Sequence, residues 1–141
     1  MKTFLLSLLM VVLSIGAKAQ TTPSTAIDAA AITCGCSTTG WSPITAYIGP
    51  NKYSVNCGYQ FNVKKAQYVK LVGTYKCSGG CAPKYIVILK KADGTILQNT
   101  SMTTFAWGYT FPDYGGYRLE VTPICNGNKC ATCTFYFTMN P

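Results

Sequence analysis

The chain has 141 residues, a formal net charge of +8, eight cysteines and no histidine. The missing histidine removes the commonest general base, the Ser-His and Cys-His nucleophile pairs, and every metal site that uses histidine. The four acids are far apart in sequence, no phosphate-cradling glycine loop is present, and no basic run of five occurs, which argues against an ordinary hydrolase and a dedicated nucleic-acid patch.

Residues 1–19 have the pattern of an export signal. Lys2 supplies the charged start, Phe4–Ile15 is an apolar run, and Ala17-Lys18-Ala19 is a small-x-small cleavage site. The apolar run is too short for a membrane span, and no second run follows. Cleavage would leave Gln20 as the N-terminus and lower the net charge from +8 to +6, because two lysines leave. We therefore expect a secreted or periplasmic protein.

Residues 20–33 are rich in Thr, Ala and Ser and are expected to form a flexible leader. Residues 34–141 are rich in Tyr, Thr, Val, Ile and Phe, with turn residues about every ten positions. This composition predicts one all-β domain, an antiparallel immunoglobulin-like β-sandwich of about seven to eight strands stapled by disulfides. The expected strands are a leading segment Trp41–Ile48 and then Tyr59–Val63, Gln67–Cys77, Tyr85–Lys90, Thr95–Gln98, Thr104–Phe111, Tyr117–Thr122 and Cys133–Met139.

All eight cysteines follow the export signal, and an even count in an exported chain predicts a disulfide framework. If the strands alternate in direction, six of the eight lie at one end of the sandwich, and the remaining two can reach it. Spacing favours local pairs: Cys77 with Cys81, Cys125 with Cys130 or Cys133, and Cys34 or Cys36 with Cys57. The full set is Cys34, Cys36, Cys57, Cys77, Cys81, Cys125, Cys130 and Cys133.

Two other readings of the cysteines stay open at this point. Cys125, Cys130 and Cys133, with Cys77 or Cys81, have a spacing that suits a four-thiolate zinc site. Cys130-Ala131-Thr132-Cys133 has the spacing of a redox pair, although here it opens a strand rather than a helix. An oxidising compartment favours disulfides over both, so we expect no metal and no cofactor.

The segment Thr104–Val121 has an aromatic strand, a turn, and then Gly116-Tyr117 at the start of an alternating strand. This pattern resembles the last hairpins of immunoglobulin-like and polycystic-kidney-disease-like (PKD-like) domains. The resemblance implies that Tyr117 is the tyrosine of a sandwich corner, with its ring buried and its hydroxyl bonded to backbone near Pro112–Tyr114. The family's mid-strand cysteine is replaced by Leu119, which puts the usual inter-sheet bridge in doubt.

The aromatic residues suggest either core or a ligand platform. Phe105, Trp107, Tyr109 and Phe111 alternate along one strand, which is typical of core. Tyr47 and three further residues lie in less regular segments, and we take the three as tentative ligand-binding residues because flat rings pack against sugars and protein surfaces. These three are Trp41, Tyr53 and Tyr114.

The sequence thus predicts a secreted, non-catalytic binding or structural module of the cell envelope or extracellular space. The alternatives are a carbohydrate-binding module and, third, a secreted cysteine-rich inhibitor or toxin. The expected partner is an extracellular protein or a glycan, and not nucleic acid.

Overall fold

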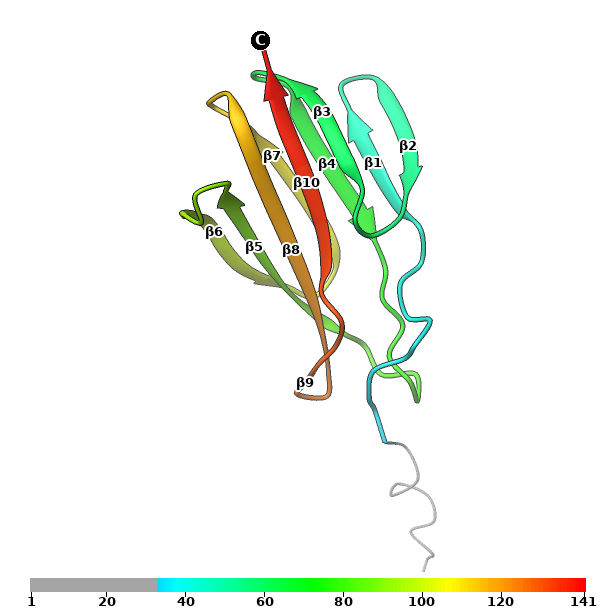
Figure 1. Cartoon of the computed structure of the whole chain (residues 1–141). Helices are drawn as coiled ribbons and strands as arrows, with labels where there is room; N and C mark the ends of the chain where they lie inside the picture. Colours follow the sequence, from blue (N-terminus) through cyan, green and yellow to red (C-terminus); the bar gives the residue numbers. More distant parts are fainter. Residues whose placement is uncertain (1–32) are drawn as a thin grey trace, which may run out of the picture. The chain divides into compact units, whose positions relative to one another are not determined.

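The computed structural model describes residues 33–141, which form two β-sheets and contain no helix (Figure 1). The expected signal peptide 1–19 and residues 20–32 of the leader lie outside the described residues. Within residues 33–141 no helix is long and apolar enough to cross a membrane. The ten strands are β1 Ile44–Ile48, β2 Asn51–Val55, β3 Gln60–Lys64, β4 Tyr68–Gly73, β5 Lys84–Lys91, β6 Ile96–Met102, β7 Phe105–Thr110, β8 Gly115–Cys125, β9 Asn128–Lys129 and β10 Cys133–Asn140.

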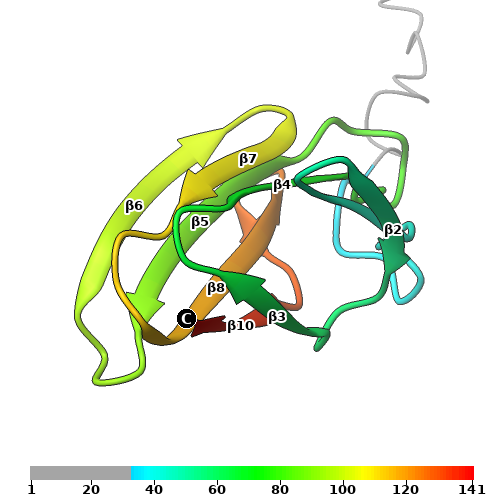
Figure 2. The same cartoon turned by 90° about the horizontal axis from the view of Figure 1, so that it is seen from above.

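One sheet has the order β2-β1-β4-β7, and all of its pairs are antiparallel. The other has the order β3-β10-β8-β5-β6, with β9 paired to β8. Only β3 and β10 run parallel among the strand pairs of this described part. Figure 2, seen from above, shows the chain passing from one sheet to the other between β6 and β7 and again between β7 and β8.

This strand order is that of an immunoglobulin-like sandwich. In it β1, β4 and β7 correspond to strands A, B and E, while β5, β8 and β10 correspond to C, F and G. The antiparallel, disulfide-stapled sandwich expected from the sequence is therefore confirmed. The expected eight strands are all present, and β2 and β9 are two short additional ones.

The core follows the alternation of the strands. Along β10 the side chains of Cys133, Phe135, Phe137 and Met139 are buried, and those between them face outward. Phe111 lies between the sheets, with its ring centre 4.8 Å from that of Tyr117 and 5.0 Å from that of Phe137. Aromatic pairs at such distances add to the free energy gained by burying their surface. Phe105, Trp107 and Phe111 are thus core residues, as the alternation indicates.

Some strand boundaries differ from the sequence-based expectation. β1 begins at Ile44 rather than Trp41 and ends at Ile48 as expected. Gly49 and Pro50 then form a tight turn into β2, for which Gly49 adopts a positive φ of 56°. β4 ends at Gly73, four residues before Cys77, and Tyr75 instead pairs with Trp41 in an isolated bridge. β6 continues to Met102 because β5 pairs along its length.

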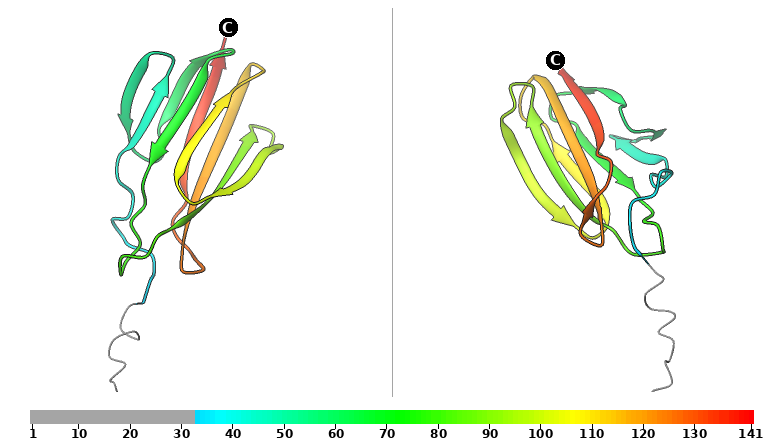
Figure 3. Two further views of the ribbon diagram at one scale, coloured as in Figure 1. Left: turned by 180° about the vertical axis from the view of Figure 1, so that it is seen from behind. Right: turned by 60° about the horizontal axis from the view of Figure 1, so that its bottom comes forward.

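Four disulfides join residues that are far apart in sequence, and no cysteine is free in residues 33–141. Three of the four have a cysteine in or next to β8, β9 or β10 as one partner. These three disulfides therefore lie toward the end of the sandwich where β8 ends and β10 begins, as the strand directions predict. Figure 3 shows that β8 ends and β10 begins at the same end of the sandwich. The pairs are Cys34–Cys81, Cys36–Cys130, Cys57–Cys133 and Cys77–Cys125.

The predicted local pairs are wrong. Cys77 bonds to Cys125 rather than Cys81, and the leading segment bonds to Cys81 and Cys130 rather than Cys57. The reason is that strand ends from different sheets meet here, so the nearest cysteine in space belongs to another strand. With all eight sulfurs paired, neither the zinc site nor the redox pair has a free thiol.

Candidate functional site

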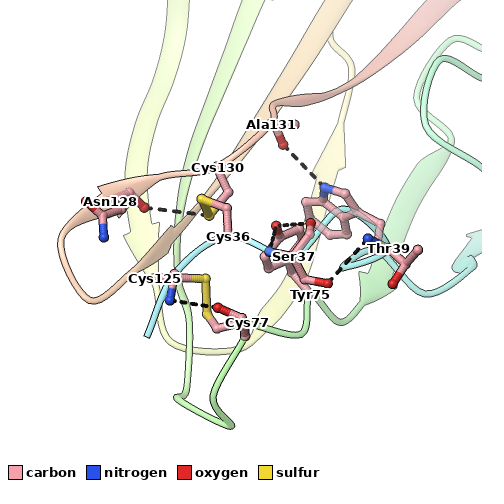
Figure 4. The surroundings of a disulfide bond; sticks show 12 residues. Cys36, Ser37, Thr39, Tyr75, Cys77, Cys125, Asn128, Cys130 and Ala131 are labelled. Atoms are coloured by element: carbon pink, nitrogen blue, oxygen red, sulfur yellow. Dashed lines mark hydrogen bonds between the residues drawn. A yellow bond between two sulfur atoms is a disulfide. The ribbon is translucent and has the colours of Figure 1, made fainter. Parts of the chain in front are cut away.

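At the cysteine end, the leading segment packs around Tyr75 (Figure 4). The Tyr75 hydroxyl donates to the Ser37 carbonyl oxygen at 2.8 Å and accepts from the Ser37 backbone N–H at 3.0 Å. A Cβ atom on Gly40 would overlap the Tyr75 ring, so glycine is required for this approach. With the disulfides of Cys34 and Cys36, these contacts fix the segment to the sandwich.

Trp41 belongs to this packed end. Its ring centre lies 5.4 Å from that of Tyr75 and 6.0 Å from those of Tyr85 and Phe105, and its Nε1 donates to the Ala131 carbonyl oxygen at 3.4 Å. Trp41 is only partly buried, but these contacts place it as a cover over the end of the core.

At the opposite end, Tyr117 has the geometry expected of the corner tyrosine. Its side chain is 4% exposed, and its hydroxyl donates to the Asp113 carbonyl oxygen at 2.9 Å. This bond spans the turn between β7 and β8 and fixes where β8 begins.

A surface depression lies next to Tyr117, on the outer face of β3, β10 and β8. It has a volume of about 380 Å³, within the range of small-molecule sites. The side chains of Gln60, Tyr136 and Arg118 lie side by side, because Tyr136 of β10 pairs with both Gln60 of β3 and Arg118 of β8. Gly116 lines it without a side chain, which leaves the hollow. The lining residues are Gln60, Lys91, Ala92, Gly116, Tyr117, Arg118, Tyr136, Phe137 and Thr138. We call this the Gly116 depression.

Two smaller hollows adjoin it. One, of about 240 Å³, shares Gly116 and Lys91 and is lined also by Tyr114. The other, of about 350 Å³, shares Gln60 and is lined also by Tyr53. The structure therefore brings two of the three predicted ligand-binding residues to the borders of one surface region. Trp41 lies apart from it, at the cysteine end.

Charged groups around the depression are held by ion pairs. Arg118 Nε lies 2.9 Å from one Glu120 carboxylate oxygen, and Lys90 Nζ lies 3.1 Å from the other. Lys91 Nζ lies 3.8 Å from Asp113. One carboxylate thus orients two cations on β8 and β5, leaving the remaining N–H groups of Arg118 as donors. Positive charge prevails here, which favours a ligand with acceptor oxygens.

Two groups elsewhere in the fold have shifted pKa values. Burial raises the pKa of Tyr85, an effect that the hydrogen bond from the Tyr75 backbone N–H partly offsets. The backbone N–H of Thr95 lowers the pKa of Asp93 in the β5–β6 turn. In residues 33–141 no three His, Cys, Asp or Glu side chains lie together in a way that could hold a metal ion.

Sequence reasoning missed the central residues of this site. Arg118 and Tyr136 look like ordinary outward-facing positions of alternating strands. Gly116 carried a usable signal, because a glycine at an outward strand position removes a side chain and often marks the close approach of a ligand or of another backbone. The pairing of β10 with both β3 and β8, which brings the side chains together, depends on strand order.

No protein-family model matches the chain, and no curated protein matches it. Among solved structures, the extracellular domain of a hybrid two-component system from B. thetaiotaomicron is similar, with a TM-score of 0.53. The identity is 12%, and the match covers 84% of this chain but 17% of that one. The chain thus spans about a sixth of the neighbour's length. At this identity the likeness concerns the fold alone.

Proposed function

We propose that this chain is an exported binding module without catalytic activity, and that its ligand binds in the Gly116 depression. The observation that carries the proposal is the convergence of Gln60, Arg118 and Tyr136 around a hollow lined by a glycine. A concave site with a few convergent polar groups on a rigid scaffold is the usual form of a ligand site. The disulfides and the export signal support the extracellular setting.

The ligand that suits this site best is a short saccharide. Tyr136 is 43% exposed and offers a ring against which a sugar can pack. Around this ring, the side chains of Gln60, Thr138 and Arg118 offer hydrogen-bond donors and acceptors to the hydroxyl groups of a sugar. The structural neighbour is also an extracellular domain, which agrees with this role.

The second candidate is a protein partner. Exposed tyrosine and arginine are enriched at protein interfaces, and Tyr53, Tyr114 and Tyr136 are all exposed around this region. A protein partner would cover a wide area, including the two adjoining hollows. A short saccharide would occupy the central depression alone.

The test is an array of oligosaccharides probed with the wild-type protein and two variants. Gly116→Val fills the depression, and Gly116 has no positive φ that would forbid the side chain. Thr134→Val is the matched control, since Thr134 faces outward on β10 but does not line the depression. We expect wild-type and Thr134→Val to bind the same saccharides and Gly116→Val to lose them.

A reducing-sugar assay on the bound saccharides is expected to detect no product. Product formation by the pure protein would contradict the non-catalytic role. Equal binding by Gly116→Val would contradict the proposed site, and binding to a protein but to no saccharide would favour the second candidate.

A further inference from the structure

A second surface lies on the other sheet, on the outer face of β2-β1-β4-β7. Four residues lie in register across its strands: Lys52 on β2, Tyr47 on β1, Lys70 on β4 and Gly108 on β7. Lys52, Tyr47 and Lys70 are exposed. Since neighbouring strands are about 4.8 Å apart, two lysines about 10 Å apart flank one tyrosine.

Tyr68 extends this row. A Cβ atom on Gly108 would overlap the Tyr68 hydroxyl and the ring carbon that carries it, so the Tyr68 ring lies across the β7 backbone at Gly108. The ring remains 54% exposed. Such a contact shields a strand glycine, and it also presents one flat ring face to solvent. We call the set Tyr47, Lys52, Tyr68 and Lys70 the lysine-tyrosine face.

The charged side chains that we describe on this face, Lys52 and Lys70, are both positive. The acids among residues 33–141 are Asp93, Asp113 and Glu120, and they lie in the β5–β6 turn, in the β7–β8 turn and on β8. None lies on β1, β2, β4 or β7. Lys52 Nζ and Lys70 therefore have no carboxylate partner on this face, and Lys52 Nζ lies 5.9 Å from the centre of the Tyr47 ring.

We propose that the lysine-tyrosine face binds an extended acidic polysaccharide, with carboxylates at Lys52 and Lys70 and sugar rings on Tyr47 and Tyr68. Charge complementarity selects a polyanion, and the flat exposed rings select a polymer with apolar sugar faces. The face is an open sheet surface without walls, which suits a chain passing across strands. It is separate from the Gly116 depression, which lies on the other sheet.

The chain contains a matched control for the lysine pair. Lys84 on β5, Ile124 on β8 and Lys129 on β9 also lie in register across three strands, and both lysines are exposed. This row has the same charge and spacing as Lys52-Tyr47-Lys70, but an isoleucine replaces the central tyrosine. General attraction of a polyanion to a basic protein affects the two rows equally.

The probes are polygalacturonate and its fully methyl-esterified form, which differ only in their carboxylate charge. We expect wild-type protein to bind polygalacturonate and to bind the ester at least tenfold more weakly. The double variant Lys52→Gln/Lys70→Gln is expected to lose about tenfold in affinity, the scale of two exposed charge contacts, while Lys84→Gln/Lys129→Gln stays near wild type. Tyr47→Ala is expected to weaken binding further without a change in net charge.

Equal losses in the two lysine double variants would overturn the proposal, since they would show charge attraction without a site. Equal binding of the ester, or preferential binding to phosphatidylglycerol vesicles or to an acidic protein, would also overturn it. All variants are surface changes on exposed strand positions, and their thermal unfolding verifies the fold. Gly116→Val is expected to keep polygalacturonate binding, so this proposal and the proposed function can fail independently.

Discussion

Cys77 is bonded to Cys125, and this pair joins the segment that follows β4 to the end of β8 across the two sheets. In immunoglobulin domains the corresponding strands, B and F, carry the inter-sheet bridge in the middle of the sandwich. Here Leu119 occupies the central position of β8 and is fully buried. The bridge between these strands is therefore present but displaced to one end.

The disulfide pairing is the first prediction. Non-reducing digestion and mass spectrometry of the protein are expected to yield peptides joined as Cys34–Cys81, Cys36–Cys130, Cys57–Cys133 and Cys77–Cys125. Reduction is expected to raise the intact mass by about 8 Da, two hydrogens for each of four bridges. A Cys77–Cys81 peptide, or bound zinc with free thiols, would contradict this pairing.

The second prediction concerns removal of the inter-sheet bridge. The double variant Cys77→Ala/Cys125→Ala is expected to lose about 4 kcal/mol of unfolding free energy, because the bridge closes a loop of intermediate length in the unfolded chain. Chemical denaturation measures this loss. A loss below 1 kcal/mol would mean that the other three bridges already restrain the unfolded chain.

The third prediction concerns the variant Tyr117→Phe. It removes the hydroxyl that donates to the Asp113 carbonyl oxygen and leaves the buried ring in place. We expect a loss of about 1 kcal/mol, the usual contribution of such a hydrogen bond. The control is Tyr136→Phe, which removes a hydroxyl from an exposed side chain. Unchanged stability of Tyr117→Phe would show that the hydrogen bond from Tyr117 to Asp113 does not stabilise the fold.

The fourth concerns Trp41, which the sequence suggested as a ligand-binding residue. Its contacts with Tyr75, Tyr85 and Phe105 predict that Trp41→Ala lowers the unfolding free energy by about 2–3 kcal/mol. Saccharide binding by the folded variant is expected to be unchanged, because Trp41 lies apart from the Gly116 depression. A stable variant with lost binding would restore the ligand role.

The fifth is a pH dependence. Burial raises the pKa of Tyr85, so the folded state favours the protonated phenol. Its contribution to stability is fully present below the unfolded pKa of about 10 and is lost as pH rises through the higher folded value. Unfolding free energy is thus expected to fall above about pH 10 in wild type and to fall less in Tyr85→Phe. The same slope in both proteins would assign the effect to other tyrosines.

The layers of the fold could be predicted from sequence because the alternation of β8 and β10 is strong. Tyr117, Leu119 and Val121 are buried on the same side of the sheet as Phe135 and Phe137, as the patterns indicate. The end at which the cysteines gather followed from strand direction alone. The individual pairs did not, because they depend on which strand ends are neighbours, and strand order is a tertiary property.

The candidate site was harder to predict from the sequence for the same reason. Gln60, Arg118 and Tyr136 come from three strands, and the first is 76 residues from the last in sequence. Trp41 misled because an aromatic in an irregular segment suits both a platform and a cover. Of the two tyrosines of the lysine-tyrosine face, Tyr47 stood out in the sequence as part of a less regular segment. Tyr68 was hidden in a regular strand, where outward and inward aromatics are told apart only by register.

The most direct test of binding without turnover is an amide NMR titration of the protein. The probes are short oligosaccharides of glucose, galactose, mannose, N-acetylglucosamine and galacturonic acid, with their own proton signals followed in the same samples. We predict that at least one probe shifts the amides of Gly116, Arg118 and Tyr136 together, while its signals stay those of the intact saccharide. Shifts that avoid these three residues with every probe, or the appearance of product signals, would contradict the account.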